Sequence, residues 1–264
     1  MSELFVDLRP ASRRAAAEDV TGAMESLVEG LRAEAFETPH CLAVVGRVDR
    51  ADLWGPYRSP DGRLLVALGG RLAFEEKEWQ EAEAMPGDGG LACKAVAFAY
   101  QREGAGAFGR LNGNFGVFVH DDVRRCCYLA TDRFGAFLLY GVTTPDRGPV
   151  FGSHPDLVAR FTGCTDRLDR TSMAEFLQSG RLTFPFTHYE SVRSQEFGVA
   201  YRFDLAEEGA RPAGRESFWE WRFAGGERAD EEELAGALAT AFQNAVRRRS
   251  LTRLGRAGIG LSGG

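Results

Sequence analysis

Short runs of alternating apolar and polar residues, separated by polar turns, predict a strand-rich chain. Strands are expected at residues 3–8, 41–48, 64–69, 114–120, 125–131, 136–142, 149–153 and 198–204. The connections between residues 114 and 153 are too short for a parallel crossover, so these strands are expected to pair antiparallel. The pattern therefore predicts an α+β fold built on antiparallel sheet.

Apolar residues at helical spacing add helices between the strands. They are expected at residues 11–36, 75–85, 91–103, 156–162, 170–179 and 230–249. In the first of these, Val20, Met24 and Leu27 recur every three or four residues, which favours one amphipathic face. The last helix starts with acidic residues and ends with three arginines, an order that matches both ends of the helix dipole.

The character of the chain changes after residue 214. Residues 206–214 are interpreted as a linker or a hairpin tip, and a strand at 257–261 follows the last helix and leads into Ser262-Gly263-Gly264. A helix, a strand and a glycine-rich turn are typical of the start of a parallel α/β domain, whose ligands lie at the carboxyl ends of the strands. Such a turn normally opens a helix whose free N–H groups hold a phosphate. A second domain is therefore expected to begin near residue 228.

Composition excludes several classes of function. The chain has 264 residues, 44% of them hydrophobic and 27% charged, which is typical of a globular protein. A net charge of -6 argues against a nucleic-acid partner. The sequence shows neither a secretory signal nor a run of about 18 apolar residues, so we expect a cytoplasmic protein without a membrane partner. The five cysteines lack C-x-x-C spacing and the four histidines are isolated, so no metal site is expected.

Five segments, taken in order, carry a resemblance to a known family. They are Arg110-Leu-Asn-Gly-Asn-Phe-Gly-Val-Phe-Val-His-Asp121, Asp132-Arg-Phe-Gly-Ala-Phe-Leu-Leu-Tyr140, Val150-Phe-Gly-Ser153, Phe218-Trp219 and Leu261-Ser262-Gly263-Gly264. Their order and spacing resemble the glutamine-hydrolysing asparagine synthetase family. That family joins an N-terminal glutaminase domain to a synthetase domain that adenylates a carboxylate with ATP.

The resemblance implies a fold and a division into domains. Residues 1–210 would form a four-layer αββα sandwich of antiparallel sheets, like that of the N-terminal-nucleophile hydrolases, here as a degenerate class II glutamine-amidotransferase-like domain. Residues 211–227 would be a linker, and residues 228–264 the start of a truncated ATP-pyrophosphatase-type synthetase domain. Leu261, Ser262, Gly263 and Gly264 would be the first half of the family's Ser-Gly-Gly-x-Asp-Ser pyrophosphate loop. ATP and Mg²⁺ are thus implied for the parent protein, whereas the 264 residues alone are expected to bind neither.

The catalytic position of the glutaminase half is altered. Family members that hydrolyse glutamine carry Cys after the initiator Met, and its thiol attacks the amide with the α-amino group as base. In this chain the position is Ser2. Two interpretations stay open, because serine is a nucleophile in other enzymes of the wider fold and is also an ordinary N-terminal residue.

Three further departures concern the substrate pocket. The Arg-Gly-Pro-Asp segment that holds the glutamine carboxylate is matched only by Leu53-Trp-Gly-Pro-Tyr57. The oxyanion turn Asn-Gly-Glu aligns with Gly69-Gly70-Arg71, where Gly70 keeps its backbone N–H but the side-chain amide is lost. The Asp that pairs with the glutamine ammonium falls near Leu91 and Ala92. These departures predict that the chain does not hydrolyse glutamine, as in β-lactam synthetases and lasso-peptide cyclases.

Two functions of different class follow from this resemblance. The chain is either the front of an ATP-dependent amide-forming ligase, whose partner would be a small-molecule or peptide carboxylate, or a non-catalytic glutaminase-like scaffold or binding domain. A homodimer is compatible with both. An Asp-Ser continuation after Gly264 would favour the ligase, and a stop codon there would favour the scaffold.

Overall fold

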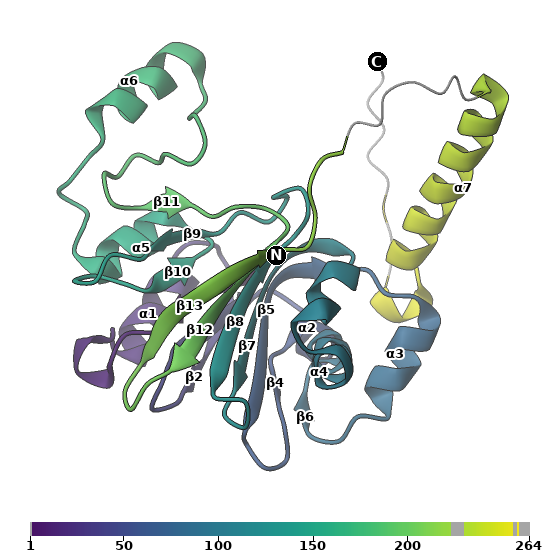
Figure 1. The fold of residues 1–264 in the computed structure, drawn as a ribbon, viewed down its shortest axis with the longest axis horizontal. Helices are drawn as coiled ribbons and strands as arrows, with labels where there is room; N and C mark the ends of the chain where they lie inside the picture. Colours follow the sequence, from purple (N-terminus) through teal and green to yellow (C-terminus); the bar gives the residue numbers. More distant parts are fainter. Residues whose placement is uncertain (1, 223–229, 256–257, 259–264) are drawn as a thin grey trace.

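Two antiparallel sheets packed face to face form the centre of the computed structural model, which describes residues 2–222, 230–255 and 258 (Figure 1). The first sheet has the strand order β11 (Arg193–Ser194), β9 (Tyr140–Val142), β10 (Val150–Gly152), β1 (Ser2–Asp7), β3 (Leu42–Arg47) and β2 (Arg32–Glu37). The second has the order β13 (Ala210–Ser217), β12 (Val199–Leu205), β8 (Cys126–Thr131), β7 (Gly113–Asp121), β5 (Leu64–Leu72), β4 (Tyr57–Arg58) and β6 (Asp88–Gly89).

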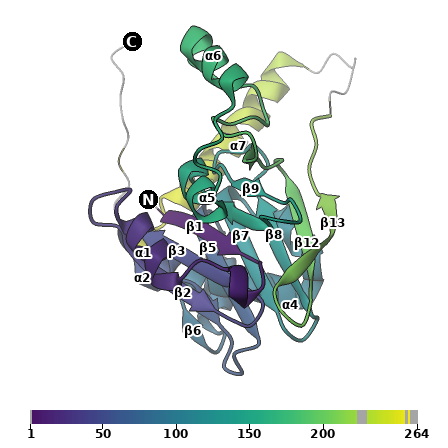
Figure 2. The same ribbon diagram turned by 90° about the vertical axis from the view of Figure 1, so that its left-hand side faces the viewer.

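Helices cover the outer faces of both sheets. The first sheet is covered by α1 (Ala17–Glu25) and α5 (Pro155–Thr162), and the second by α2 (Ala51–Trp54), α3 (Glu76–Glu83), α4 (Leu91–Glu103) and the 3-10 segment η2 (Gly104–Arg110). Short 3-10 turns lie at η1 (Ala11–Arg13) and η3 (Thr252–Leu254). Helix α6 (Arg170–Ser179) projects from the sandwich (Figures 1 and 2), and α7 (Glu231–Arg249) projects from it except at its C-terminal end, which lies beside α3 (Figure 1). Each helix among the described residues is too short or too polar to cross a membrane.

The pleat of each strand distributes its side chains between the layers. In β1, Leu4 and Val6 are buried between the two sheets, whereas Phe5 is buried against α1 and α5. In β7, Phe118 faces the first sheet, and its neighbour Val117 packs against the helices on the other side. Because side chains alternate with a period of two, the continuous apolar runs of these strands fill two interfaces at once. The result is the four-layer arrangement expected from the sequence.

The single helix expected at residues 11–36 is wrong. The segment instead contains η1, α1 and the edge strand β2. Helix α1 ends at Glu25, and Gly30, with φ of 79°, reverses the chain so that residues 32–37 pair with β3. Ala and Glu are good helix formers, but pairing with a central strand overrides that weak local preference.

Two other boundaries differ from the expectation. The strand expected at 136–142 is only three residues long, because residues 132–137 fold around the carboxylate of Asp132. Residues 206–209 are the tip of a hairpin, and residues 210–217 continue as β13 at the edge of the second sheet. Residues 211–217 of the expected linker, 211–227, are therefore part of a strand. Phe218 continues the packing, since its N–H donates to the Gly198 carbonyl at 2.9 Å.

The helix expected at 230–249 is found as α7. The side chain of Asp230 caps it by accepting from the N–H of Glu232 at 3.0 Å. The strand expected at 257–261 and the turn Ser262-Gly263-Gly264 lie outside the described residues, apart from Gly258.

Candidate functional site

Ser2 lies at the start of β1 and points toward the second sheet. Its Oγ accepts from the N–H of Gly70 and donates to the carbonyl of the same residue, both at 2.7 Å. The residue is only 8% exposed. Across residues 2–222, 230–255 and 258, no ionisable side chain is hydrogen-bonded to this hydroxyl. The structure thus brings together Ser2 and Gly70, two residues that are 68 positions apart.

Gly70 is a strand residue rather than the turn expected from the sequence. It pairs with Phe115 in the β5–β7 ladder and has φ of 85°. A Cβ at this position would lie 2.0 Å from the carbonyl oxygen of Asn114. Only glycine fits such a positive φ and so close an approach. This backbone conformation aims the Gly70 N–H between the sheets, where Ser2 meets it.

The neighbouring Gly69 has no room for a side chain. A Cβ there would lie 2.4 Å from Cζ of Phe137 and 2.9 Å from Cβ of Leu4. The Phe137 ring therefore occupies the space beside Gly69 that a side-chain amide would need. Phe137 was not identified from the sequence, although it lies inside the Asp132–Tyr140 motif.

The buried carboxylate of Asp132 fixes the loop that carries Phe137. Its Oδ1 accepts from the N–H groups of Phe134 at 2.9 Å and Ala136 at 3.1 Å. Its Oδ2 accepts from those of Phe137 at 2.8 Å and Phe115 at 3.2 Å. Asp132 is only 1% exposed, so these four backbone donors replace its hydration. The loop is held against β7 directly opposite Gly70.

A cavity of about 730 Å³ lies beside Arg71, the residue that follows Gly70 in β5. Its walls come from the sandwich and from the C-terminal helix: Trp54, Arg71, Leu72, Ala73 and Asn114, together with Phe242, Val246, Arg249, Ser250 and Leu254. Leu91 and Ala92 lie elsewhere. They start α4, with Ala92 buried in the core beneath the second sheet and Leu91 packed against that core. The cavity therefore contains two of the altered segments, at positions 54 and 71, but not the third.

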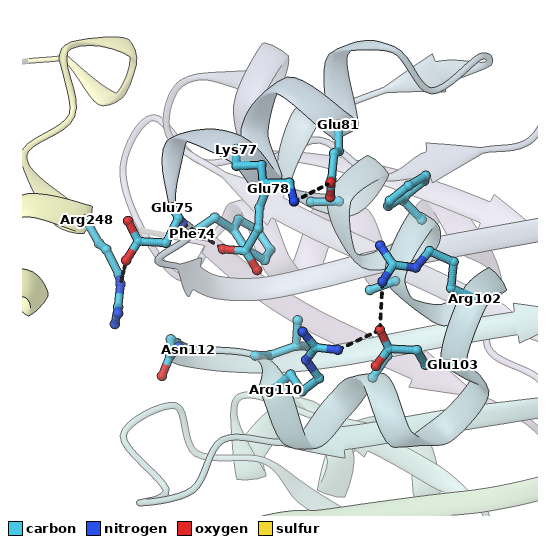
Figure 3. A pocket seen from close by; sticks show the side chains of 15 residues that line it. Phe74, Glu75, Lys77, Glu78, Glu81, Arg102, Glu103, Arg110, Asn112 and Arg248 are labelled. Carbon is cyan, nitrogen blue, oxygen red and sulfur yellow. Dashed lines mark hydrogen bonds and ion pairs between the residues drawn. The ribbon is translucent and has the colours of Figure 1, made fainter.

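Ion pairs hold the end of α7 against α3. Arg248 contacts Glu75 at 2.5 Å (Figure 3). Arg247 contacts the same carboxylate at 2.8 Å, and Arg253 contacts Glu83 at 2.6 Å. The hydrogen bond from Arg248 is the main cause that lowers the pKa of Glu75. Leu254 adds apolar packing on the same core. This wall of the cavity is therefore anchored to the sandwich.

A second cavity of about 390 Å³ lies on the other side of this contact, between α3, α4 and η2 (Figure 3). Its charged rim is largely self-paired. Glu103 pairs with Arg110 at 2.8 Å and Arg102 at 3.3 Å, and Lys77 with Glu81 at 3.8 Å. Such paired groups leave little uncompensated charge for a ligand.

Two groups of titratable residues lie away from Ser2. On the outer face of β1, Ser153 donates to Glu3 at 2.5 Å and His154 contacts the same carboxylate at 3.3 Å. The hydrogen bond from His154 to Glu3 raises the pKa of the histidine. The imidazoles of His40 and His120 stack at 5.9 Å, and burial lowers the pKa of His120 to about 4. Within the described part of the chain, no group of three or more His, Cys, Asp or Glu residues is placed to hold a metal.

Comparison with known proteins identifies the architecture. Residues 41–219 match the family model described as a glutamine amidotransferase domain. Similar solved structures include the allosteric regulatory enzyme of purine biosynthesis, with a TM-score of 0.52 and 13% identity, and the glutamine phosphoribosylpyrophosphate amidotransferase from B. subtilis, with 0.51 and 12%. Each alignment covers 83% of this chain and 49% of the other, so the chain spans about half the length of these structures. A search of curated sequences finds no match.

These similarities confirm the predicted fold. The two packed antiparallel sheets with outer helices are those of the N-terminal-nucleophile hydrolase sandwich. The expectation of a type 2 glutamine amidotransferase domain is likewise confirmed, by a model that matches most of the sandwich.

Proposed function

Because the chain belongs to the glutamine amidotransferase domain family, we propose that it is the front part of an asparagine-synthetase-like, ATP-dependent, amide-forming ligase whose glutaminase half is inactive. The observation that supports an inactive glutaminase half is the packing around the oxyanion position, Gly69 and Gly70. Phe137 fills the space beside Gly69, and the hydroxyl of Ser2 bonds both polar groups of Gly70.

Hydrolysis of glutamine needs a nucleophile, a base and two donors for the oxyanion. At Ser2 the hydroxyl proton points to the backbone carbonyl of Gly70, and within the described part of the chain the donor to this hydroxyl is the Gly70 N–H alone. Losing one oxyanion donor typically costs on the order of a hundredfold in rate. Trp54 stands in the segment that would otherwise hold the glutamine carboxylate, and Arg71 stands in the segment of the oxyanion turn. We therefore propose that ammonia is not produced here.

The ligase part of the proposal rests on the resemblance of Ser262-Gly263-Gly264 to a pyrophosphate loop and on the surface of the two projecting helices. In α6, Leu177 is 83% exposed, and in α7, Leu234 and Leu238 are 57% and 71% exposed. Soluble domains rarely expose large side chains in such rows unless another surface covers them. A synthetase domain would supply that surface and bring the carboxylate and amine together.

ATP and Mg²⁺ would supply adenylation of the carboxylate in this parent ligase. Leu261, Ser262, Gly263 and Gly264 would hold the pyrophosphate, and they lie outside the described residues. The proposed role of the sandwich is structural, because it positions α7 through the ion pairs of Glu75 and Glu83.

The glutaminase proposal is tested by ammonia release from the Met1-processed chain with L-glutamine. We expect wild type, Ser2→Ala and Ser2→Cys to give the same background rate, because the nucleophile is only one of the altered features. Release that Ser2→Ala abolishes would contradict the proposal. Activity gained in Ser2→Cys would show that the pocket still binds glutamine.

The ligase proposal is tested on the product of the complete reading frame. Carboxylate-dependent exchange of pyrophosphate into ATP is expected for that protein, and no exchange for residues 1–264 alone. A stop codon directly after Gly264 would refute it and leave the second candidate, a binding or scaffold domain. The cavity beside Gly70 favours that candidate because the sandwich and α7 already enclose it.

A further inference from the structure

We propose that the cavity beside Gly70 binds a small organic carboxylate that carries an apolar body. The cavity has a volume of about 730 Å³, which is within the range that holds small ligands. Its walls combine exposed cationic groups, a side-chain amide and apolar surface. The inference rests on the proposed loss of glutamine hydrolysis, since a pocket that turned over glutamine would be assigned to that substrate.

The first cationic group is the guanidinium of Arg71. Its Cζ lies 5.8 Å from the ring centroid of Trp54, a stacking contact that orients the planar group. Among the described residues it pairs with the carboxylate of Asp49 at 3.7 Å, and the two side chains are 58% and 56% exposed. An exposed pair at this distance holds its partners weakly. Arg71 can therefore exchange Asp49 for a ligand carboxylate.

Arg249 is the second cationic group. Among the described residues, its guanidinium contacts only the carbonyl of Ala245, at 3.5 Å, and no carboxylate. Neighbouring arginines differ in this respect: Arg50 pairs with Asp52 at 2.8 Å, and Arg248 with Glu75 at 2.5 Å. Arg249 therefore places an uncompensated positive charge on the cavity wall, where it favours the binding of an anion.

The other residues of the cavity wall indicate which chemical groups the ligand carries besides its carboxylate. Trp54 and Leu72 are buried at 5% and 3% exposure and form an apolar floor. Phe242 and Val246 of α7 face the same space and are 68% and 45% exposed. A ligand with an aromatic or aliphatic body would remove this surface from water. The exposed Asn114 adds a side-chain amide that can pair with a peptide-like group.

We expect the cavity to prefer a ligand with a carboxylate and no ammonium group over an amino-acid zwitterion, because the side chain of Arg71 is positively charged. Among the described residues that line the cavity, the ionisable ones are Arg71 and Arg249, and both are cationic. A ligand ammonium beside Arg71 would be repelled, and an anion would be attracted. The cavity is therefore expected to reject free L-glutamine and to accept an acylated amino acid.

Isothermal titration of the intact chain with hippurate, N-benzoylglycine, tests this inference. Hippurate offers a carboxylate, an amide and a phenyl ring, and a Kd of about 1 mM or tighter is expected for a ligand of its size. Arg71→Glu should weaken binding about tenfold, and Arg249→Gln several-fold. The matched control is Arg63→Glu, the same charge change at the other end of β5, where Arg63 faces Asp122 at 3.7 Å. It should bind as wild type does, and near-UV circular dichroism checks the fold of each variant.

Three results would overturn the inference: no heat of binding with hippurate, equal affinity in Arg71→Glu and Arg63→Glu, or equal binding of benzylamine. Tighter binding of phenyl phosphate than of hippurate would overturn the choice of carboxylate. The titration needs no turnover. Ammonia release that depends on Ser2 would refute the proposed function, while the hippurate result would still report on the cavity, so the two failures are distinguishable.

Discussion

Replacing Asp132 by Ala is predicted to destabilise the sandwich more than any change at an exposed acidic residue. The carboxylate is 1% exposed and accepts from four backbone N–H groups, two on each oxygen. Removing it leaves all four donors without that partner in a loop that packs on Gly69. At about 1 kcal/mol for each donor, the expected loss is about 4 kcal/mol. This is a large share of the roughly 5–15 kcal/mol that stabilises a typical domain.

The Asn variant separates hydrogen bonding from general disruption. Its one carbonyl oxygen keeps two acceptor contacts and its NH₂ group loses the other two, so a loss of about 2 kcal/mol is expected. Asp122→Ala is the matched control. Asp122 pairs with Arg125 at 2.8 Å, its side chain is 36% exposed, and its removal should cost about 0.5 kcal/mol.

Urea unfolding followed by tryptophan fluorescence and by circular dichroism measures these differences, with melting temperatures as a second readout. About 4 kcal/mol corresponds to a fall of about 10 °C in Tm for a domain of this size. If Asp132→Ala lay within 1 kcal/mol of wild type, or if the Ala and Asn variants were equally stable, the account of this loop as a carboxylate-centred structure would be refuted.

Two further predictions concern buried groups. Gly69→Ala should destabilise by about 2 kcal/mol, because its Cβ would meet Phe137 at 2.4 Å, whereas Gly214→Ala, with nothing within 4 Å, should be neutral in the same urea titration. Burial lowers the pKa of His120 to about 4 from 6.5, so its contribution to stability is full above pH 6.5 and is lost as the pH falls toward 4. Unfolding free energy should drop by about 2 kcal/mol between pH 7 and pH 5; the same drop in His120→Phe would contradict this cause.

Sequence patterns predicted the central strands and most helices, because the apolar residues of these strands fill two buried interfaces and those of each helix form one buried stripe. The four-layer fold came from the resemblance, whose segments fall on β7, β10 and the Asp132 loop. The helix expected at residues 11–36 failed because β2 depends on its pairing with β3, a contact that local composition does not encode.

Of the candidate site, only the positions of Ser2 and Gly70 were predicted before the structure was known. Ser2 and Gly70 were identified from the resemblance, and their hydrogen bonds depend on how β1 packs on β5. The role of Phe137 could not be inferred from sequence, since it depends on the loop bonded to Asp132. Arg249 reaches the cavity only because Glu75 and Glu83 hold the end of α7, and pairings across about 170 residues have no local signal.

The packing of Phe137 explains both why position 69 has no room for a side-chain amide and how the two sheets stay packed without one. Phe137 lies against both Gly69 and Gly116, so its ring replaces contacts that side chains on two neighbouring strands would otherwise make. A side-chain amide at position 69 would displace this ring, and the ring cannot move without breaking the hydrogen bonds of Asp132. We therefore expect that cysteine at position 2 alone will not give hydrolysis of glutamine. We expect that a smaller residue at 137 together with Gly69→Asn would also be needed, and that this combination would lower the stability of the sandwich.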